Sequence, residues 1–384
     1  MPSDYPTLLQ IAPIPLSSTK LQHTRLQGIV TSLTELGYDS IVCSYAQSKD
    51  LHGAENLRTT FKHDIRTHEQ LEKSALSTHL KLTLLCINTF RVHNPIAIHA
   101  YGFRGLKISA IVKACFFWKQ TPIICDLSDS EVDKLKKRHR FSLSALLMKM
   151  ANVVICSSQN SLEVVQRELA LDSAKAALVV SGINSYTQLS DDRIETIRQK
   201  LKIDESRTVI AVNGGLEKGS TELKELQKII HSFKKMSDQL HFLIIGEPKK
   251  YLYSFLKKYE LRSMCSLVGD VPEKLLPKYY SVTNLALCLD RSNNDDNRIN
   301  ILNFMANALP VVCYETKLQT QYLAQNSPFS SSISDLRNAL KDLHYNRQWQ
   351  IELADQNYQQ FEEFYSWEVS KEQLHATYSQ VLEE

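Results

Sequence analysis

Five short apolar runs define the second half of this 384-residue chain, and each leads into a glycine or an acidic residue. They read RTVIAVNGG (207–215), LHFLIIGE (240–247), CSLVGDV (265–271), TNLALCLD (283–290) and LPVVCYE (309–315). Segments of helical periodicity separate these runs. Strands that alternate with helices are typical of a parallel sheet covered by helices on both faces.

The first half repeats this alternation. Its apolar runs are TLLQIAP (7–13), DSIVCSYA (39–46), PIAIHAY (95–101), TPIICDL (121–127), NVVICSS (152–158) and ALVVS (177–181). The amphipathic stretch 23–37 ends in Gly37, which we expect to terminate a helix. Two such series predict an α/β protein of two facing Rossmann-like, doubly wound domains with a cleft between them. The expected boundaries are 1–185 for the first domain, 186–206 for a polar linker, 207–360 for the second domain and 361–384 for a C-terminal helix.

Composition describes an ordinary globular protein, with 43% hydrophobic and 23% charged residues and a formal net charge of +3. Residues 1–185 hold 21 basic and 15 acidic groups, and the rest of the chain holds 24 basic and 27 acidic groups. This difference in charge between the halves is too small to indicate nucleic-acid binding. No run reaches the roughly 18 apolar residues of a membrane span, and the first residues lack the pattern of a signal peptide. The eight cysteines form no CxxC pair, so we expect no metal site, no disulfide and a cytoplasmic location.

Glycine is scarce, at 11 residues, less than half of what a usage of roughly 7% would give. In the second half, glycines that follow strand-like runs are Gly214, Gly215, Gly246 and Gly269. Ligands of open parallel sheets bind beyond the carboxyl ends of the strands. We therefore expect these glycines to let the backbone approach a ligand there, although each also suits a plain turn.

Two cations near these strand ends are candidates for binding phosphate. Lys218 lies in the loop GGLEKG, and Arg298 lies near the start of a helix whose amides favour anions. Lys218 could instead be an ordinary solvated lysine. The segment SNNDDNR, which contains Arg298, could instead be a polar loop that binds no ligand.

The order of these runs resembles the retaining glycosyltransferases of family 4, which have the GT-B fold. The resemblance rests on VIAVNGGLEKG, LHFLIIGE, CSLVGDVPEKLLPKYYSVTNLALCLD and ILNFMANALPVVCYE in the second half, and on PIAIHAYG, TPIICDLSD and ANVVICSSQNSLEVV in the first. The ending FYSWEVSKEQLHATYSQVL is similar to the C-terminal helix of that family. The resemblance implies an acceptor domain, a donor domain and a last helix that packs back toward the first domain.

The family's donor site has two glutamates separated by seven residues, which fall on Asp295 and Asn303 here. The resemblance implies that Asn303 meets the ribose and that Asp295 lies near the donor sugar. It also implies that Asn300 stands in place of a frequent lysine and Ala308 in place of a glycine. The remaining implied nucleotide contacts are Asp270, Val271, Glu273 and Ile299, beside the glycines already named.

In the first domain, the resemblance implies a glycine-rich loop where this chain reads APIPLSSTKLQHTR, without glycine before Gly28. His99 stands where the family often carries a histidine. Its side chain could be catalytic, or it could be a hydrogen-bonded residue of the core. Asp126 and Asp129 resemble an aspartate-rich loop at the cleft of some members, and Asp129 also suits a helix N-cap.

The segment Lys134 to Arg140, KLKKRHR, is the only basic cluster. It could touch anionic lipid head groups or a lipid-linked acceptor at the inner face of a membrane. A charge run of this kind also suits a solvated helix face.

The leading hypothesis is a retaining transfer of a sugar from a UDP- or GDP-sugar to a hydroxyl acceptor, in the synthesis of cell-surface polysaccharide or glycoconjugates. The acceptor would be a glycan, a lipid-linked sugar or a small molecule. Lys218, Arg298 and helix amides would hold the diphosphate, and Asp295 would orient the sugar. The departures at Gly215, Asn300, Asn303 and Ala308, with the glycine-free first loop, keep a second hypothesis open, a degenerate homologue that binds or stabilises an active transferase. A sugar-nucleotide epimerase or a phosphorylase is the third.

Overall fold

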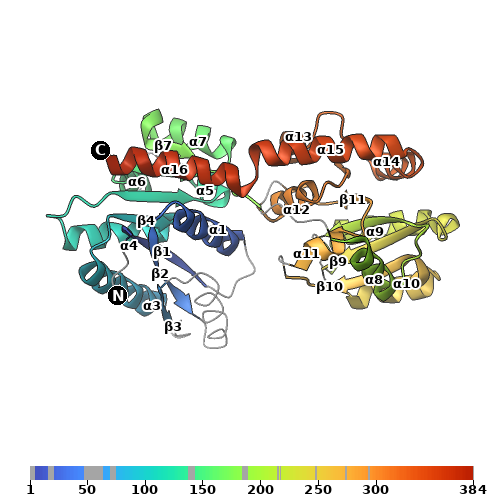
Figure 1. The fold of residues 1–384 in the computed structure, drawn as a ribbon, viewed down its shortest axis with the longest axis horizontal. Helices are drawn as coiled ribbons and strands as arrows, with labels where there is room; N and C mark the ends of the chain where they lie inside the picture. The colour runs from blue at the N-terminus through green and yellow to red at the C-terminus, as the bar shows by residue number, and fades with distance from the viewer. Residues whose placement is uncertain are drawn as a thin grey trace. The chain divides into compact units, whose positions relative to one another are not determined.

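The computed structural model describes the chain except for residues 1–4, 16–20, 47–63, 70–74, 137–142, 184–188, 214–215, 217, 247–248, 273–274, 293–294 and 384. The chain divides into two compact units. Unit 1 comprises Met1–Gly182 and Trp367–Glu384, and unit 2 comprises Ile183–Ser366 (Figure 1). Both units are parallel sheets covered by helices, which confirms the predicted fold class of two Rossmann-like α/β domains. The predicted cleft between them stays a prediction.

Unit 1 is built on a seven-stranded parallel sheet of order β3-β2-β1-β4-β5-β6-β7. Its strands are β1 (Thr7–Pro15), β2 (Asp39–Ala46), β3 (Asp64–Glu69), β4 (Ala97–Tyr101), β5 (Ile123–Leu127), β6 (Val153–Cys156) and β7 (Ala176–Leu178). Its helices are α1 (Leu21–Glu35), α3 (Ala75–His93), α4 (Gly102–Cys115), α5 (Asp129–Lys136), α6 (Leu143–Met148), α7 (Gln159–Leu169), the 3₁₀ turn Ser173–Lys175 and α16 (Trp367–Glu383).

Successive residues along the strands of unit 1 are buried on opposite faces of the sheet. One face packs against α3, α4, α5, α6 and α7, and the other against α1 and α16. Helices α1 and α16 lie side by side, and Gly28 makes this contact possible (Figure 1). A Cβ atom at Gly28 would lie only 1.9 Å from Cζ2 of Trp367. Gly37, with φ +86°, terminates α1 as predicted.

Unit 2 is built on a six-stranded parallel sheet of order β10-β9-β8-β11-β12-β13. Its strands are β8 (Thr208–Asn213), β9 (Leu240–Ile245), β10 (Cys265–Gly269), β11 (Leu285–Cys288), β12 (Val311–Tyr314) and β13 (Phe329–Ser330). Its helices are α8 (Asp191–Leu201), α9 (Thr221–Ser232), α10 (Lys249–Lys258), α11 (Leu276–Tyr280), α12 (Asp295–Ala306), α13 (Lys317–Tyr322), α14 (Ile333–Tyr345) and α15 (Arg347–Phe364), with 3₁₀ turns at Lys234–Met236 and Arg262–Met264. Helices α9, α10 and α14 cover one face, and α8, α11, α12 and α13 cover the other.

The segment expected as a linker, 186–206, differs from that expectation because it contains helix α8. The charged sequence DDRIETIRQKL presents an apolar face, and Ile197 and Ile203 are buried in the core of unit 2. The chain passes from unit 1 to unit 2 after Gly182 and returns after Ser366.

Each sheet has one point at which the strand order reverses. In unit 1 the first strand β1 lies between β2 and β4, and in unit 2 the first strand β8 lies between β9 and β11. Helices that leave neighbouring strands in opposite directions open a crevice at such a point, at the carboxyl ends of the strands. The expected ligand positions are therefore the loops after β1 and β4 and the loops after β8 and β11.

Candidate functional site

An asparagine side chain holds the carboxyl end of β8 against α11 and α12. At the end of β8, Asn213 donates through Nδ2 to the hydroxyl of Tyr280 at 2.8 Å and to Oδ1 of Asn300 at 3.0 Å. Asn300 belongs to α12, the helix that follows β11. This contact fixes the first turns of α12 beside the end of β8, and α12 therefore starts at the strand-order reversal.

The loop between β11 and α12 is fixed by buried amides. Asn297 donates through Nδ2 to the carbonyl oxygens of Asp290 at 3.2 Å and Ser292 at 2.7 Å, and Gln319 donates to the Asp290 carbonyl at 2.8 Å. The thiol of Cys288 donates to Oδ1 of Asn297 at 3.2 Å. These bonds fix the described part of the loop, residues 289–292, ahead of the helix.

Helix α12 carries five of the predicted donor-site residues. Asp295 is its first residue, but its side chain lies outside the described residues. Arg298 stands in the first turn and is buried, so this stretch is a packed helix rather than a polar loop. Ile299 is half-buried, and Asn303 is completely buried. The structure therefore brings Asn300, Arg298 and Asn303 together on one helix, with Asn303 facing its packed interior.

Ala308 occupies the position where the resembling family has a glycine. Its φ is +50°, the left-handed conformation that favours glycine at a helix C-terminus. The amide of Ala308 donates to the carbonyl of Met305 at 2.9 Å, and that of Leu309 donates to Phe304 at 3.1 Å. The backbone thus makes the turn that glycine would make, but the Cβ of Ala308 adds strain to this conformation.

Lys218 is exposed at the carboxyl end of β8. Its Nζ lies 4.8 Å from the ring centroid of Tyr251 on α10, a cation–π contact between the loops after β8 and β9. Gly219, with φ +82°, leads into α9, whose N-cap Ser220 accepts from the amide of Leu223 at 3.1 Å. Gly214 and Gly215 lie outside the described residues.

The ends of β9 and β10 are joined through their glycines. Gly246 and Gly269 have φ values of +107° and +84°, and the amide of Gly246 donates to the carbonyl of Gly269 at 2.9 Å. Asp270 and Val271 follow directly, whereas Glu273 lies outside the described residues. The two glycines have the positive φ that the sequence reasoning expected of turn positions, and their role toward a nucleotide stays a prediction.

A cluster that the sequence reasoning did not identify lies at the ends of β11 and β12. Arg291 forms an ion pair with Glu225 at 2.9 Å, and the hydroxyl of Tyr314 donates to the same carboxylate at 2.9 Å. The Arg291 guanidinium stacks 3.6 Å from the centroid of the Tyr314 ring. Burial, together with the bond to Glu225, raises the pKa of Tyr314 and keeps its hydroxyl protonated. Because 66 residues separate Arg291 from Glu225, no local pattern reveals this pair.

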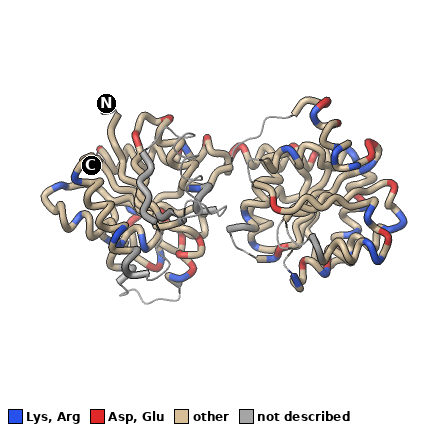
Figure 2. The backbone as a smooth tube through the Cα atoms, turned by 90° about the horizontal axis from the view of Figure 1, so that it is seen from below, with Lys and Arg blue, Asp and Glu red and all other residues tan. Residues whose placement is uncertain are grey.

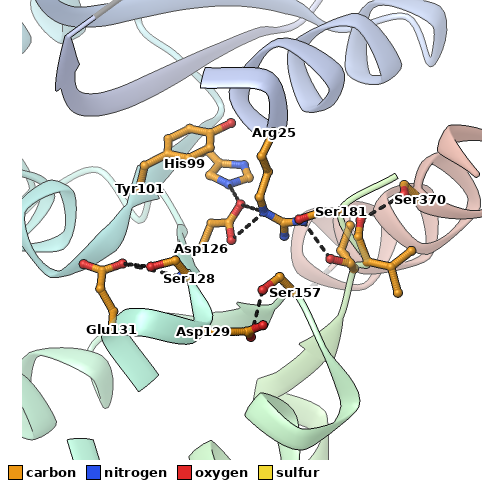
Figure 3. A network of polar contacts seen from close by, with 12 residues as sticks. Arg25, His99, Tyr101, Asp126, Ser128, Asp129, Glu131, Ser157, Ser181 and Ser370 are labelled. Atoms are coloured by element: carbon orange, nitrogen blue, oxygen red, sulfur yellow. Dashed lines mark hydrogen bonds and ion pairs between the residues drawn. The ribbon is translucent and has the colours of Figure 1, made fainter. Parts of the chain in front are cut away.

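In unit 1 the predicted His99 belongs to a buried network around Asp126 (Figure 3). Arg25 on α1 donates through Nε to both carboxylate oxygens of Asp126, at 3.1 and 2.9 Å. His99 Nε2 lies 3.7 Å from the same carboxylate, and His99 Nδ1 lies 2.7 Å from the hydroxyl of Tyr378 on α16. The network therefore joins α1, β4, β5 and α16. Since His99 is fully buried, the geometry favours its core alternative over the catalytic one.

The titration of this network follows from its burial. Burial lowers the pKa of His99, and Asp126 offsets this only in part, so the imidazole is neutral at pH 7. Burial raises the pKa of Asp126, but Arg25 and His99 outweigh it and the pKa is lowered overall. Arg25 also donates through Nη1 to the Val179 carbonyl at 2.9 Å and the Ser181 hydroxyl at 3.0 Å.

Two further carboxylates of unit 1 lie at helix N-termini along the same edge of the sheet. Glu131 accepts from the amide of Phe103, in the first turn of α4, at 2.9 Å. Asp129 accepts from the hydroxyls of Ser157 at 3.0 Å and Ser158 at 2.8 Å, and Ser158 is the N-cap of α7 (Figure 3). The helix N-termini after β4 and β6 are therefore filled by the protein's own acidic side chains. The predicted loop residues 16–20 lie outside the described residues.

A cavity of about 600 Å³ in unit 2 lies away from these strand ends. Its lining includes Asn284 and Pro310, which directly precede β11 and β12, together with Asp355 of α15. It therefore opens at the amino edge of the sheet, opposite to the edge where ligands of such sheets bind. We do not assign the donor site to it.

Over the described parts of the chain, no group of three His, Cys, Asp or Glu residues is arranged to hold a metal ion. None of the described helices is long and apolar enough to cross a membrane. Of the predicted basic cluster, Lys134 is exposed on α5, and residues 137–140 lie outside the described residues.

Residues 193–350 match the family model described as "Glycosyl transferases group 1". No match was found among curated proteins. Among solved structures, Alr3699/HepE of Anabaena in complex with UDP and glucose is similar with 15% identity and a TM-score of 0.70, over 98% of this chain and 100% of that one. A glycosyltransferase of Rickettsia africae is similar with 11% identity and a TM-score of 0.72, over the full length of both chains.

The same fold also occurs in a protein of a different activity class. A putative UDP-N-acetylglucosamine 2-epimerase of Listeria monocytogenes is similar with 10% identity and a TM-score of 0.68, over 99% of this chain and 97% of that one. At such identities the likeness concerns the fold. The chain therefore has the two-domain architecture of GT-B proteins, and the part that matches glycosyl transferases group 1 lies within unit 2.

Proposed function

We propose that the protein is a glycosyltransferase that moves a sugar from a nucleoside diphosphate sugar to a hydroxyl acceptor, with retention at the anomeric carbon. The observation that carries the proposal is the placement of α12. Its first turn, with Arg298, lies at the strand-order reversal of the unit that matches glycosyl transferases group 1. A helix N-terminus with a cation in its first turn suits a diphosphate.

The residues of unit 2 then have distinct tasks. The amides at the start of α12 and the exposed Lys218 would hold the diphosphate as it leaves, which lowers the barrier by stabilising the developing charge. Asp295 would orient the donor sugar, and Asn300 and Asn213 would keep α12 in place relative to β8. In this scheme the bond from the anomeric carbon to the diphosphate breaks as the bond to the acceptor oxygen forms, the proton of the acceptor hydroxyl passes to the leaving diphosphate, and no covalent intermediate with the protein is needed.

A uridine donor is the first choice, because HepE of Anabaena was crystallised with UDP and glucose. A guanosine donor stays the alternative. Asn303 would meet the ribose through its amide, since an asparagine both donates and accepts hydrogen bonds where a glutamate only accepts them. Its complete burial requires α12 or its neighbours to shift when the nucleotide binds.

The second candidate, a catalytically degenerate binding partner, is favoured by that same burial. With Asn303 packed in the interior and Ala308 in a strained conformation, the helix could serve as structure alone. The two candidates differ in nucleotide binding, which a transferase requires.

The test is the thermal shift of the full chain with UDP, GDP and their glucose conjugates. For the transferase we expect one nucleotide to raise the Tm, and Lys218→Ala to weaken its affinity about ten- to hundredfold, the worth of a charged hydrogen bond. Lys228→Ala, which removes an exposed lysine further along α9, is the matched control and should leave the affinity unchanged. Absence of a shift with every nucleotide would support the degenerate partner instead.

A further inference from the structure

Three neighbouring helices of unit 1 carry no acidic residue, unlike α5 and α7 on the same face of the sheet. Helices α3, α4 and α6 contain no aspartate or glutamate, and none occurs anywhere from residue 75 to residue 125. Helix α3 packs against α4, and α4 packs against α6, so the three form one layer over the sheet (Figure 1). In unit 2, by contrast, basic and acidic residues are interspersed (Figure 2).

The ends of these helices meet at one edge of the sheet. Helices α3, α4 and α6 directly precede β4, β5 and β6, which are neighbours in the sheet. Because the strands are parallel, the last turns of all three helices lie at the amino edge. The large apolar side chains exposed there form what we call the apolar edge, and they are Val92, Ile96, Ile111, Phe117, Trp118, Leu146 and Met150.

The aromatic part of the apolar edge is anchored to the core. Phe117 and Trp118 are 78% and 63% exposed. The Trp118 ring lies 5.6 Å from Phe116, and Phe116 stacks at 4.7 Å on Phe90, which is buried. The exposed rings are therefore presented by a packed cluster.

Cations surround the apolar edge without acidic partners on the same helices. Lys113 on α4, Lys119 after it and Lys149 after α6 stand among the exposed apolar side chains. Further along the layer, burial and then Arg104 and Lys107 of α4 lower the pKa of His79 on α3. Arg104 and Lys107 thus lie close enough to α3 to act on its histidine.

The positions of the cations, taken alone, can be explained by the helix dipole without any binding partner. Arg91 and Lys113 lie in last turns of helices, where a positive charge stabilises the helix dipole. This does not account for Phe117 and Trp118, because a folded monomer gains nothing from exposing two adjacent aromatic rings. Contiguous apolar patches on soluble proteins mark surfaces that bind a partner or a membrane.

We propose that the apolar edge of unit 1 binds the surface of an anionic lipid bilayer. Tryptophan and phenylalanine insert at the level of the head groups, and lysines beside them attract anionic lipids. A second copy of the chain suits this surface poorly, since symmetric pairing would bring Lys113, Lys119 and Lys149 against their own kind. The proposal does not depend on the proposed transferase activity.

The experiment is flotation of the full chain with vesicles of phosphatidylcholine, with and without phosphatidylglycerol. We expect the protein to float with the anionic vesicles, and less so as the salt concentration rises. Each lysine near an anionic surface strengthens binding roughly fivefold, so Lys113→Glu with Lys149→Glu should weaken it by more than about tenfold. Phe117→Ser with Trp118→Ser should weaken binding to a similar extent, and both side chains are exposed enough to leave the fold intact.

The matched control, Lys257→Glu with Lys341→Glu, reverses the charge of two exposed lysines of unit 2 and should float like the wild type. Circular dichroism of each variant verifies the fold. The proposal is overturned if the wild type floats with neither vesicle, or if the control loses as much binding as the apolar-edge variants. It is also overturned if the wild type is a dimer that Phe117→Ser with Trp118→Ser dissociates, because a second copy would then cover the surface.

Discussion

The two units have the same parallel architecture but differ in which side chains stand at the carboxyl ends of their strands. In unit 1 the carboxylate of Glu131 accepts from an amide in the first turn of α4, and that of Asp129 accepts from the hydroxyl of Ser158, the N-cap of α7. In unit 2 the exposed Lys218 follows β8, and Asn213 contacts Asn300 of α12, a helix whose first turn holds Asp295 and the buried Arg298. A helix N-terminus binds an anion only if none is already there. On the proposed function, we therefore expect the anionic ligand near Lys218 of unit 2 rather than at the starts of α4 and α7 in unit 1.

The largest effect that tests this comparison concerns the buried ion pair of unit 1. Arg25→Ala leaves Asp126 buried without its partner, and we expect a loss of about 3–5 kcal/mol in the free energy of unfolding. Urea denaturation measures it. The control is Lys371→Ala, which removes the partly exposed pair with Glu35 and should cost less than about 1 kcal/mol. Equal losses in the two variants would mean that the buried network is not a structural centre of unit 1.

The next effect concerns a histidine in the core of unit 2. Burial, and after it Arg207 and Arg198, lowers the pKa of His241 to about 4. An unfolded histidine binds its proton near pH 6.5, so the unfolded state gains protons first as the pH falls. The stability contributed by neutral His241 is complete above pH 6.5 and is lost between that value and pH 4, by about 3 kcal/mol.

His241→Gln should therefore flatten the dependence of stability on pH across this window. The measurement is the midpoint of urea unfolding at several pH values, for wild type and variant. Parallel profiles for the two proteins would show that other groups cause the acid sensitivity of the fold.

The smallest effect concerns the strained turn at the end of α12. Ala308→Gly removes a Cβ from a residue with φ +50°, and we expect a gain of about 1 kcal/mol in stability. Thermal unfolding measures this gain. A destabilised variant would mean that the Cβ of Ala308 makes contacts worth more than the backbone strain.

Much of the fold could be predicted from the sequence, because buried parallel strands are continuous apolar runs. Two strands were not predicted, and both lie at sheet edges, although the other edge strands β7 and β10 were predicted. Strand β3 has the polar sequence DIRTHE, and β13 is only two residues long. Helix α8 was taken for a linker because its apolar face is a thin stripe among charged residues.

The site was predicted less completely, because its contacts join distant parts of the chain. Lys218 and Arg298 are recognisable from loops that follow strands. Arg25 pairs with Asp126 across 101 residues, and Asn213 meets Asn300 across 87. A polar residue amid the apolar face of a helix, such as Arg25 in HTRLQGIV, is the one local signal that a buried partner exists.

The central claim is that the strand-order reversal of unit 2 binds a nucleoside diphosphate. Hydrogen–deuterium exchange of the full chain with and without UDP, and with GDP in parallel, tests it most directly. The account predicts that one nucleotide slows exchange at the start of α9, in the loop after β11 and in the first turns of α12. It predicts that the nucleotide does not contact the starts of α4 and α7 and so does not slow exchange there, because carboxylates of the protein already occupy both helix N-termini. Slowing confined to those unit 1 helices, or none with either nucleotide, would contradict the account.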